Sequence, residues 1–303
     1  MNFPHIDTFS RIGHCIRAPQ AIAAYPMESF KKKTLNIFGS LGQEWLDNLP
    51  CLIQTLSHQW GLFDLHPIDA PSFNYVLTGL QGSTPIVLKV GLHYDELTRE
   101  AAALHIYKGF GAVEIRANDP AKGAILLERM MPGTTLKSLF PDHTSDSLKL
   151  VCALMKRLHE APISSPNTFP TLHQWLSDLE KDGPLAPHYL DRARYLKKQL
   201  FESHVQPVLL HGDLHFENIL LHDTEWVAID PKGILGDPLA DIWPFIREPA
   251  IEIPQLAEIL NQDPTRIRDW CFVQVSSAAK WNLETNLDTR QLLKFLGKLD
   301  QMY

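Results

Sequence analysis

The chain has 303 residues with a hydrophobic content of 45%, which suffices for one large two-lobed domain or two modest domains. No apolar run approaches the roughly 18 residues of a membrane span, no signal peptide is evident, and a net charge of −7 disfavours a nucleic-acid partner. The four cysteines are far apart, which disfavours a zinc site or a disulfide framework, so we expect a cytoplasmic protein.

The predicted elements are β-rich at first and mainly helical afterwards. Residues 1–40 show little periodicity and are expected to form an irregular arm, followed by a helix over 43–60 that Pro50 interrupts. The further predicted elements are strands over 73–80 and 85–90, a helix over 95–108, strands over 112–115 and 124–128, and helices over 145–160, 171–181, 190–203 and much of the chain after Pro238. We therefore predict an α+β fold with two lobes, over 1–129 and 130–303.

The segment 211–230 carries the residues with the clearest chemical role. In a loop that follows a short apolar run, Asp213 precedes Asn218 by five residues. Two more short apolar runs predict a hairpin over 219–229, with Asp230 directly after it. Asn218 and Asp230 would therefore lie at the same end of that hairpin.

This arrangement contains the parts that phosphoryl transfer from a nucleotide requires. One aspartate can accept the proton of an attacking hydroxyl, while an asparagine amide oxygen and a second carboxylate can hold the magnesium ion on the nucleotide phosphates. We therefore predict Asp213 as the catalytic residue and Asn218 and Asp230 as ligands of Mg²⁺, in the order that protein kinases use. The alternative is an ordinary loop and hairpin with polar ends.

Lys89 is the next candidate. It ends an apolar run over 86–88, so its ammonium would leave a strand at a place where a lysine can pair with nucleotide phosphates. A glutamate on the following helix can hold such a lysine; Glu100 is the expected partner, and Glu96, one turn earlier, is the alternative. A lysine that simply reaches water at a strand end would give the same pattern.

The loop that would cover the phosphates departs from the protein-kinase pattern, because no G-x-G-x-x-G precedes Lys89. Ser72 and Asn74 could instead supply a hydroxyl and an amide to the phosphate oxygens. Both residues could equally be turn residues.

The segment Ile229–Pro238, which reads IDPKGILGDP, resembles the aminoglycoside and hydroxyurea antibiotic phosphotransferases, the branch that contains the streptomycin kinases. Further similarity lies in 44–62, 87–89 and 126–133, so the resemblance spans most of the chain. It implies a bilobal, protein-kinase-like fold with a cleft between the lobes. It also implies ATP and Mg²⁺ as cofactors, and a small polar acceptor such as an aminoglycoside or hydroxyurea.

The resemblance extends to the place of the nucleotide base. Residues 126–130 predict a strand that runs into a linker between the lobes. In kinases the adenine edge bonds to linker backbone, so fold analogy implies that the backbone around Glu128 and Met130 contacts adenine. An edge strand that ends at a Pro-Gly turn is the alternative.

Other functions stay open at this point. The acceptor could be another small alcohol, such as an amino alcohol or a sugar, and a non-catalytic nucleotide-binding module is a further alternative. No Ser, Thr or Tyr lies between Asp230 and Asp263, which argues against a protein kinase switched by phosphorylation in this segment. We interpret His211 and His215 as groups that support the loop, since no H-E-x-x-H zinc motif is present. The sequence does not indicate an oligomeric state.

Charged residues after the hairpin have several possible roles. Lys232 could contact the phosphate or the acceptor, or could pair with Asp237 or Asp241. These two aspartates could bind backbone amides of the loop or cap a helix, and Asp241 could instead face the acceptor. Together with Glu248 and Glu252 they could also form an acidic wall that attracts a cationic acceptor.

Overall fold

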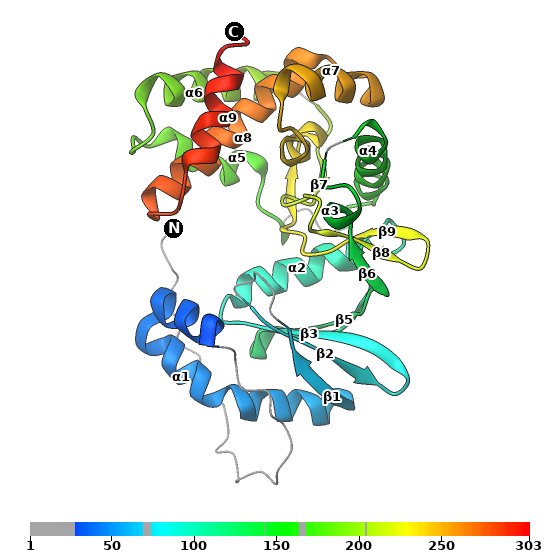
Figure 1. The fold of residues 1–303 in the computed structure, drawn as a ribbon. Helices are drawn as coiled ribbons and strands as arrows, with labels where there is room; N and C mark the ends of the chain where they lie inside the picture. The colour runs from blue at the N-terminus through cyan, green and yellow to red at the C-terminus, as the bar shows by residue number, and fades with distance from the viewer. Residues whose placement is uncertain (1–27, 69–73, 143, 164–167, 204) are drawn as a thin grey trace. The chain divides into compact units, whose positions relative to one another are not determined.

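The computed structural model describes residues 28–68, 74–142, 144–163, 168–203 and 205–303 (Figure 1). They belong to two compact units, of which the first ends at Leu92 and the second begins at His93. The predicted lobe boundary after residue 129 lies inside the second unit and remains a prediction. No helix among these residues is long and apolar enough to cross a membrane.

The first unit combines one long helix with an antiparallel meander of three strands. The helix is α1 (Glu28–Trp60), and the strands are β1 (Leu62–Pro67), β2 (Tyr75–Gln81) and β3 (Thr84–Val90), paired in the order β1-β2-β3. Strands β2 and β3 confirm the predicted pair, and Gly82, with a φ of +62°, makes the tight turn between them. Strand β1 was not predicted.

The expected irregular arm is wrong for the described part of 1–40, because α1 already begins at Glu28. The helix kinks at Gly39, whose φ of +55° is not helical, and it continues through Pro50. Phe30 anchors the first part of α1: its ring lies 6.2 Å from that of Trp45 and 5.2 Å from that of Tyr75. These aromatic contacts stabilise the part of α1 that precedes Gly39. Residues 1–27 lie outside the described part.

The second unit begins with helix α2 and contains three separate groups of strands. Helix α2 (Tyr94–Ile106) is followed by the antiparallel pair β4 (Ile115–Asp119) and β5 (Ala124–Glu128). A second sheet has the order β6-β8-β9, and a third is the pair β7–β10. Their bounds are β6 Pro132–Thr135, β7 Val208–Leu210, β8 Ile219–His222, β9 Glu225–Ala228 and β10 Ile234–Gly236.

Helices form most of the second unit (Figure 1). The α-helices are α3 Leu136–Leu139, α4 Ser145–His159, α5 Leu172–Trp175, α6 Pro187–Glu202, α7 Pro249–Leu260, α8 Pro264–Glu284 and α9 Arg290–Asp300. Short 3-10 helices are η2 Pro120–Lys122, η4 Ser177–Glu180, η5 Pro238–Asp241 and η6 Trp243–Phe245. The helix predicted over 171–181 is therefore split into α5 and η4.

A single hydrophobic cluster holds this unit together. Phe245, Trp270 and Phe272 are almost completely buried in it, as is Tyr107, whose hydroxyl donates to the Leu209 carbonyl at 2.9 Å. The bond connects the end of α2 to β7. Strand β7 and the loop after it are thus fixed against the core.

Gly212, in the loop after β7, packs closely against β10, so we expect a side chain at this position to destabilise the fold. A Cβ at Gly212, whose φ is +79°, would lie 2.7 Å from Cδ1 of Ile234. Gly109, with a φ of +81°, has no heavy atom within 4 Å of such a Cβ. Alanine in a left-handed backbone costs about 1–2 kcal/mol at either place, and overpacking at Gly212 adds about 1–3 kcal/mol. We expect Gly212→Ala to lower the free energy of unfolding in urea by more than Gly109→Ala does; equal losses would contradict this packing.

Candidate active site

The loop after β7 begins with buried residues and leaves the side chain of Asp213 exposed to solvent. Leu209 and Leu210 of β7 are buried in the core, and the His211 side chain is completely buried. Gly212 then turns the chain with its positive φ, and the Asp213 carboxylate emerges with 42% of its side chain exposed. The start of the loop is thus fixed in the core, and the carboxylate of Asp213 is accessible.

The buried carboxylate of Asp241, in η5, holds the base of this loop. It accepts the backbone N–H groups of His211 and Gly212, both at 2.8 Å, and lies 3.0 Å from Nε2 of His159. Burial alone would raise the pKa of Asp241, but these hydrogen bonds outweigh it and hold the pKa below its ordinary value. The resulting stabilisation is present above about pH 4 and is lost as the pH falls through the lower folded-state pKa.

His211 connects this loop to the end of the hairpin, as its interpretation as a supporting group requires. Its Nδ1 accepts the backbone N–H of Asp213 at 3.3 Å, so the hydrogen of the neutral ring lies on Nε2, which donates to the Ile229 carbonyl at 2.9 Å. Burial lowers the pKa of His211, against the opposite effect of the nearby carboxylates, of which Asp241 is the strongest. The neutral ring fits both hydrogen bonds.

The predicted hairpin is confirmed as β8 and β9. Ile219 pairs with Ala228, and the backbone N–H of Ile229 donates to the Asn218 carbonyl at 2.9 Å. Asn218 and Asp230 therefore lie at the same end of the hairpin, as expected. The fold brings them together with Asp213, because Nδ2 of Asn218 donates to the Asp213 carbonyl at 3.0 Å.

The chemistry of the side chains at this end of the hairpin is of the kind that suits a magnesium ion, and their role as metal ligands remains a prediction. Since the Asn218 amide nitrogen is bonded to the loop, its Oδ1 is the atom left for a metal. Asp230 offers a carboxylate. Its backbone is left-handed, with a φ of +62°, and this conformation is uncommon and costs energy in residues other than glycine. An amide oxygen and a carboxylate are the hard oxygen ligands that Mg²⁺ takes.

Two basic side chains flank the Asp213 carboxylate. Nε2 of His215 lies 3.8 Å from its Oδ1, and Nζ of Lys232 lies 3.9 Å from its Oδ2. The alternative in which Lys232 pairs with Asp237 or Asp241 is therefore wrong. Asp237 instead caps η5 through the backbone N–H of Leu239, at 2.9 Å, and forms an ion pair with an arginine of α8.

The expected acidic wall is wrong for three of its four members, which are buried and serve internal bonds. Asp237 and Asp241 are buried with the partners given above. Glu252 is buried too, and it accepts the backbone N–H groups of Arg247 and Glu248. The Glu248 side chain itself lies 2.5 Å from Nζ of Lys298. Asp237, Asp241 and Glu252 therefore stabilise the fold, whereas Glu248 is exposed and pairs with Lys298.

The other predicted nucleotide residues lie in both units. Lys89, on β3, is only 4% exposed, and Glu100, on α2, is 7% exposed. A buried ammonium and a buried carboxylate each require a compensating partner. Glu96 is exposed, so burial favours Glu100 over that alternative. The pairing of Lys89 with Glu100 remains a prediction.

Asn74 directly precedes β2, and its side chain lies against Gly91, after β3. A Cβ at position 91 would collide with Oδ1 of Asn74, so a side chain there would require Asn74 to move. Ser72 lies outside the described residues. The contribution of both residues to phosphate binding stays a prediction.

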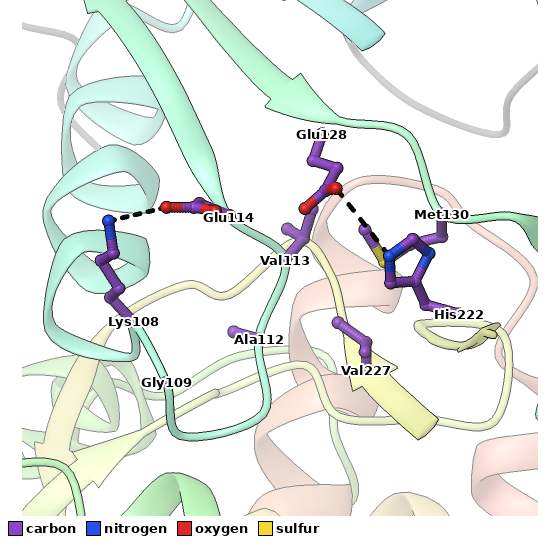
Figure 2. A pocket seen from close by; sticks show the side chains of 9 residues that line it. All are labelled: Lys108, Gly109, Ala112, Val113, Glu114, Glu128, Met130, His222 and Val227. Atoms are coloured by element: carbon purple, nitrogen blue, oxygen red, sulfur yellow. Dashed lines mark ion pairs between the residues drawn. The ribbon is translucent and has the colours of Figure 1, made fainter. Parts of the chain in front are cut away.

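Glu128 and Met130, at the end of β5, line a pocket of about 330 Å³ (Figure 2). A second wall is the loop after α2, where Nζ of Lys108 lies 2.6 Å from Oε1 of Glu114. The third wall is the hairpin β8–β9, where Nε2 of His222 lies 3.8 Å from Oε1 of Glu128. Apolar side chains line the pocket between these ion pairs.

His222 of this pocket lies at the turn end of the hairpin, whereas Asn218 and Asp230 lie at the opposite end. The backbone after β5 is held by the hairpin and by the loop after α2: the N–H of Glu128 donates to the Glu114 carbonyl at 3.0 Å, and the N–H of Met131 donates to a ring nitrogen of His222 at 3.1 Å. Adenine binding by the backbone around Glu128 and Met130 remains a prediction, as does the role of this segment as a linker between lobes.

Sequence reasoning did not identify His159, which supports the loop through Asp241 from the last turn of α4. Its position 82 residues from Asp241 left no local signal. Arg266, the partner of Asp237, was missed for the same reason. A loop-supporting role for Asp241 was one of the predicted alternatives, and the structure confirms it.

The family model described as aminoglycoside/hydroxyurea antibiotic resistance kinase matches residues 64–286. A streptomycin 6-kinase from Streptomyces glaucescens is 28% identical over 82% of this chain and 87% of its own length. A hydroxyurea phosphotransferase from Kitasatospora aureofaciens is 28% identical over 89% of this chain and 83% of its own length.

The fold is shared with solved structures as well. A thermostable mutant of the aminoglycoside phosphotransferase APH(4)-Ia, solved as a ternary complex with AMP-PNP and hygromycin B, gives a TM-score of 0.60 at 16% identity. The match covers 82% of this chain and 96% of that chain. The predicted α+β, kinase-like fold is thereby confirmed. The chain belongs to the aminoglycoside/hydroxyurea antibiotic resistance kinase family and is a kinase-family enzyme.

Proposed function

We propose that this enzyme transfers the γ-phosphoryl group of ATP to a hydroxyl of a small polar molecule, an aminoglycoside of the streptomycin type or hydroxyurea, and thereby inactivates an antibiotic. The observation that carries the proposal is the juxtaposition of Asp213, Asn218 and Asp230 in one hydrogen-bonded loop and hairpin. The acceptor class comes from the relatives, which are named for streptomycin and hydroxyurea.

Asp213 would face the acceptor. Its carboxylate accepts a hydrogen bond from the attacking hydroxyl, orients that hydroxyl and takes its proton late, because a loose transition state requires little early deprotonation. Because the start of the loop is fixed, the carboxylate has little freedom to move, and such positioning of a reacting group raises the rate.

Asn218 and Asp230 would hold magnesium through Oδ1 and the carboxylate. When bound, the ion neutralises charge on the nucleotide phosphates. Lys89, held by Glu100, would pair with phosphate oxygens, and Ser72 and Asn74 would add polar contacts. The linker backbone at Glu128 and Met130 would contact adenine.

A direct test measures ATP consumption by the purified protein with streptomycin, other aminoglycosides, hydroxyurea and amino alcohols. Mass spectrometry then shows whether an acceptor gains one phosphoryl group. The proposal requires acceptor-dependent ATP use with streptomycin or hydroxyurea. Phosphorylation of an amino alcohol alone would refute the assigned acceptor class, and ATP binding without transfer to any acceptor would refute the assigned activity.

Asp213→Asn tests the catalytic role. Asparagine keeps the size of the side chain and can still form hydrogen bonds, but it cannot accept the proton. Such roles contribute roughly 10²–10⁴-fold in rate, so we expect kcat to fall by about that factor with near wild-type ATP affinity. Nucleotide affinity and turnover should be measured on the same preparation. Intact turnover would remove Asp213 from the chemistry, and weakened ATP binding with unchanged kcat would make it a nucleotide ligand.

Asp230→Asn tests the metal assignment, and Asp223→Asn is its matched control. Both aspartates have a left-handed backbone, with φ of +62° and +51°, and asparagine tolerates this conformation. Only Asp230 lies at the Asn218 end of the hairpin. We expect Asp230→Asn to weaken magnesium-dependent nucleotide binding in calorimetry by at least about tenfold, since a charged ligand is lost, and Asp223→Asn to have no such effect. Equal behaviour of the two variants would contradict the assignment.

A further inference from the structure

Lys232 lies beside the Asp213 carboxylate without being bonded tightly to it. The distance of 3.9 Å from Nζ to Oδ2 is longer than a hydrogen bond, and Asp213 is the only ion-pair partner of Lys232 among the described residues. The Lys232 side chain is 40% exposed, so its ammonium can turn toward a ligand. A lysine ammonium carries three donors on a flexible stem.

The backbone of Lys232, in contrast, is fixed against the loop. Its N–H donates to the His211 carbonyl at 2.6 Å, and its carbonyl accepts from Nε of Arg99 at 3.3 Å. A Cβ at Gly212 would lie 3.1 Å from Cβ of Lys232, so the lysine stem starts directly beside the chain that carries Asp213. The position of the stem is set before any ligand binds.

These distances bring the ammonium within reach of the phosphoryl group. An acceptor hydroxyl bonded to Asp213 lies about 2.6–3.2 Å from its carboxylate, and the attacked phosphorus lies about 3–3.5 Å beyond that oxygen. The phosphorus is therefore about 6 Å from the carboxylate, and Nζ of Lys232 already lies 3.9 Å from the same carboxylate. The ammonium can donate to a phosphoryl oxygen if its flexible stem turns toward the side of Asp213 on which the acceptor binds.

We propose that Lys232 is a catalytic residue whose ammonium binds the transferring phosphoryl group, and that Asp213 keeps it in place until the nucleotide arrives. The inference rests on the phosphoryl transfer proposed above. A bond forms between the acceptor oxygen and phosphorus, the bond from phosphorus to the leaving oxygen of the nucleoside diphosphate breaks, and the acceptor proton passes to Asp213. Lys232 keeps its protons and stabilises the negative charge of the moving group.

His215 provides a matched control, because it flanks the other oxygen of the same carboxylate. Its Nδ1 accepts the backbone N–H of Glu217 at 3.2 Å, so the neutral ring directs its hydrogen from Nε2 toward Asp213. His215 is thus bonded to the loop itself. A residue that only supports the Asp213 charge should affect ATP-like and ADP-like ligands equally.

The experiment compares Lys232→Met, Lys232→Arg and His215→Gln with the wild-type protein. Calorimetry gives the affinity for the magnesium complexes of AMP-PNP, which has a γ-phosphoryl group, and of ADP, which lacks one. We expect Lys232→Met to bind ADP normally, to bind AMP-PNP at least about tenfold more weakly, and to lose about 10²–10³-fold in kcat. Lys232→Arg should recover part of both losses, and His215→Gln should leave the ratio of the two affinities unchanged.

A lower kcat in Lys232→Met with an unchanged affinity ratio would overturn the proposal, because the lysine would then act only on Asp213. The same change of ratio in His215→Gln would overturn it as well. If the wild-type protein binds neither nucleotide, the proposed function itself falls, and this inference falls with it. Circular dichroism and thermal melting confirm that each variant is folded before its affinities are compared.

Discussion

The buried carboxylate of Asp241 is the constraint on which the rest of the site depends. It is 3% exposed and is compensated by the backbone N–H groups of His211 and Gly212 and by the ring of His159. A buried charge is tolerated only when its partners are in place, and removal of one partner costs about 3–5 kcal/mol. The loop therefore cannot move away from Asp241 without a large penalty, and helix α4 is coupled to the loop through His159.

Hydrogen bonds connect the loop that Asp241 holds to the residues of the proposed chemistry. His211 bonds to Ile229 and so fixes the chain just before Asp230, which has to adopt a left-handed backbone. Asn218 bonds to the carbonyl of Asp213, so one proposed magnesium ligand also fixes the proposed catalytic residue. An arrangement that is set before ligands bind needs less ordering during the reaction, which is the physical advantage of this network.

The local parts of the site could be predicted from the sequence, whereas its long-range contacts could not. Regular spacing and apolar runs identified the hairpin and the residues at its end, because strand pairing across a two-residue turn is a local property. The acidic wall was wrong for Asp237, Asp241 and Glu252, because the sequence gives the sign of a charge but not its burial, and Glu252 bonds to backbone amides. Strands β6 and β10 contain Gly or Pro, which lower strand propensity, so tertiary pairing decides their structure.

Hydrogen exchange at the backbone amides of His211 and Gly212 tests the central role of Asp241 most directly. In the wild-type protein both amides donate to a buried carboxylate and should exchange slowly. Asp241→Asn removes the charge, and a hydrogen bond to a charged group contributes about 1.5–3 kcal/mol, so exchange at these two amides should accelerate by about 10–150-fold. Amides in the middle of α8 should stay protected, which shows that the fold persists. Unchanged protection at His211 and Gly212 would contradict the account.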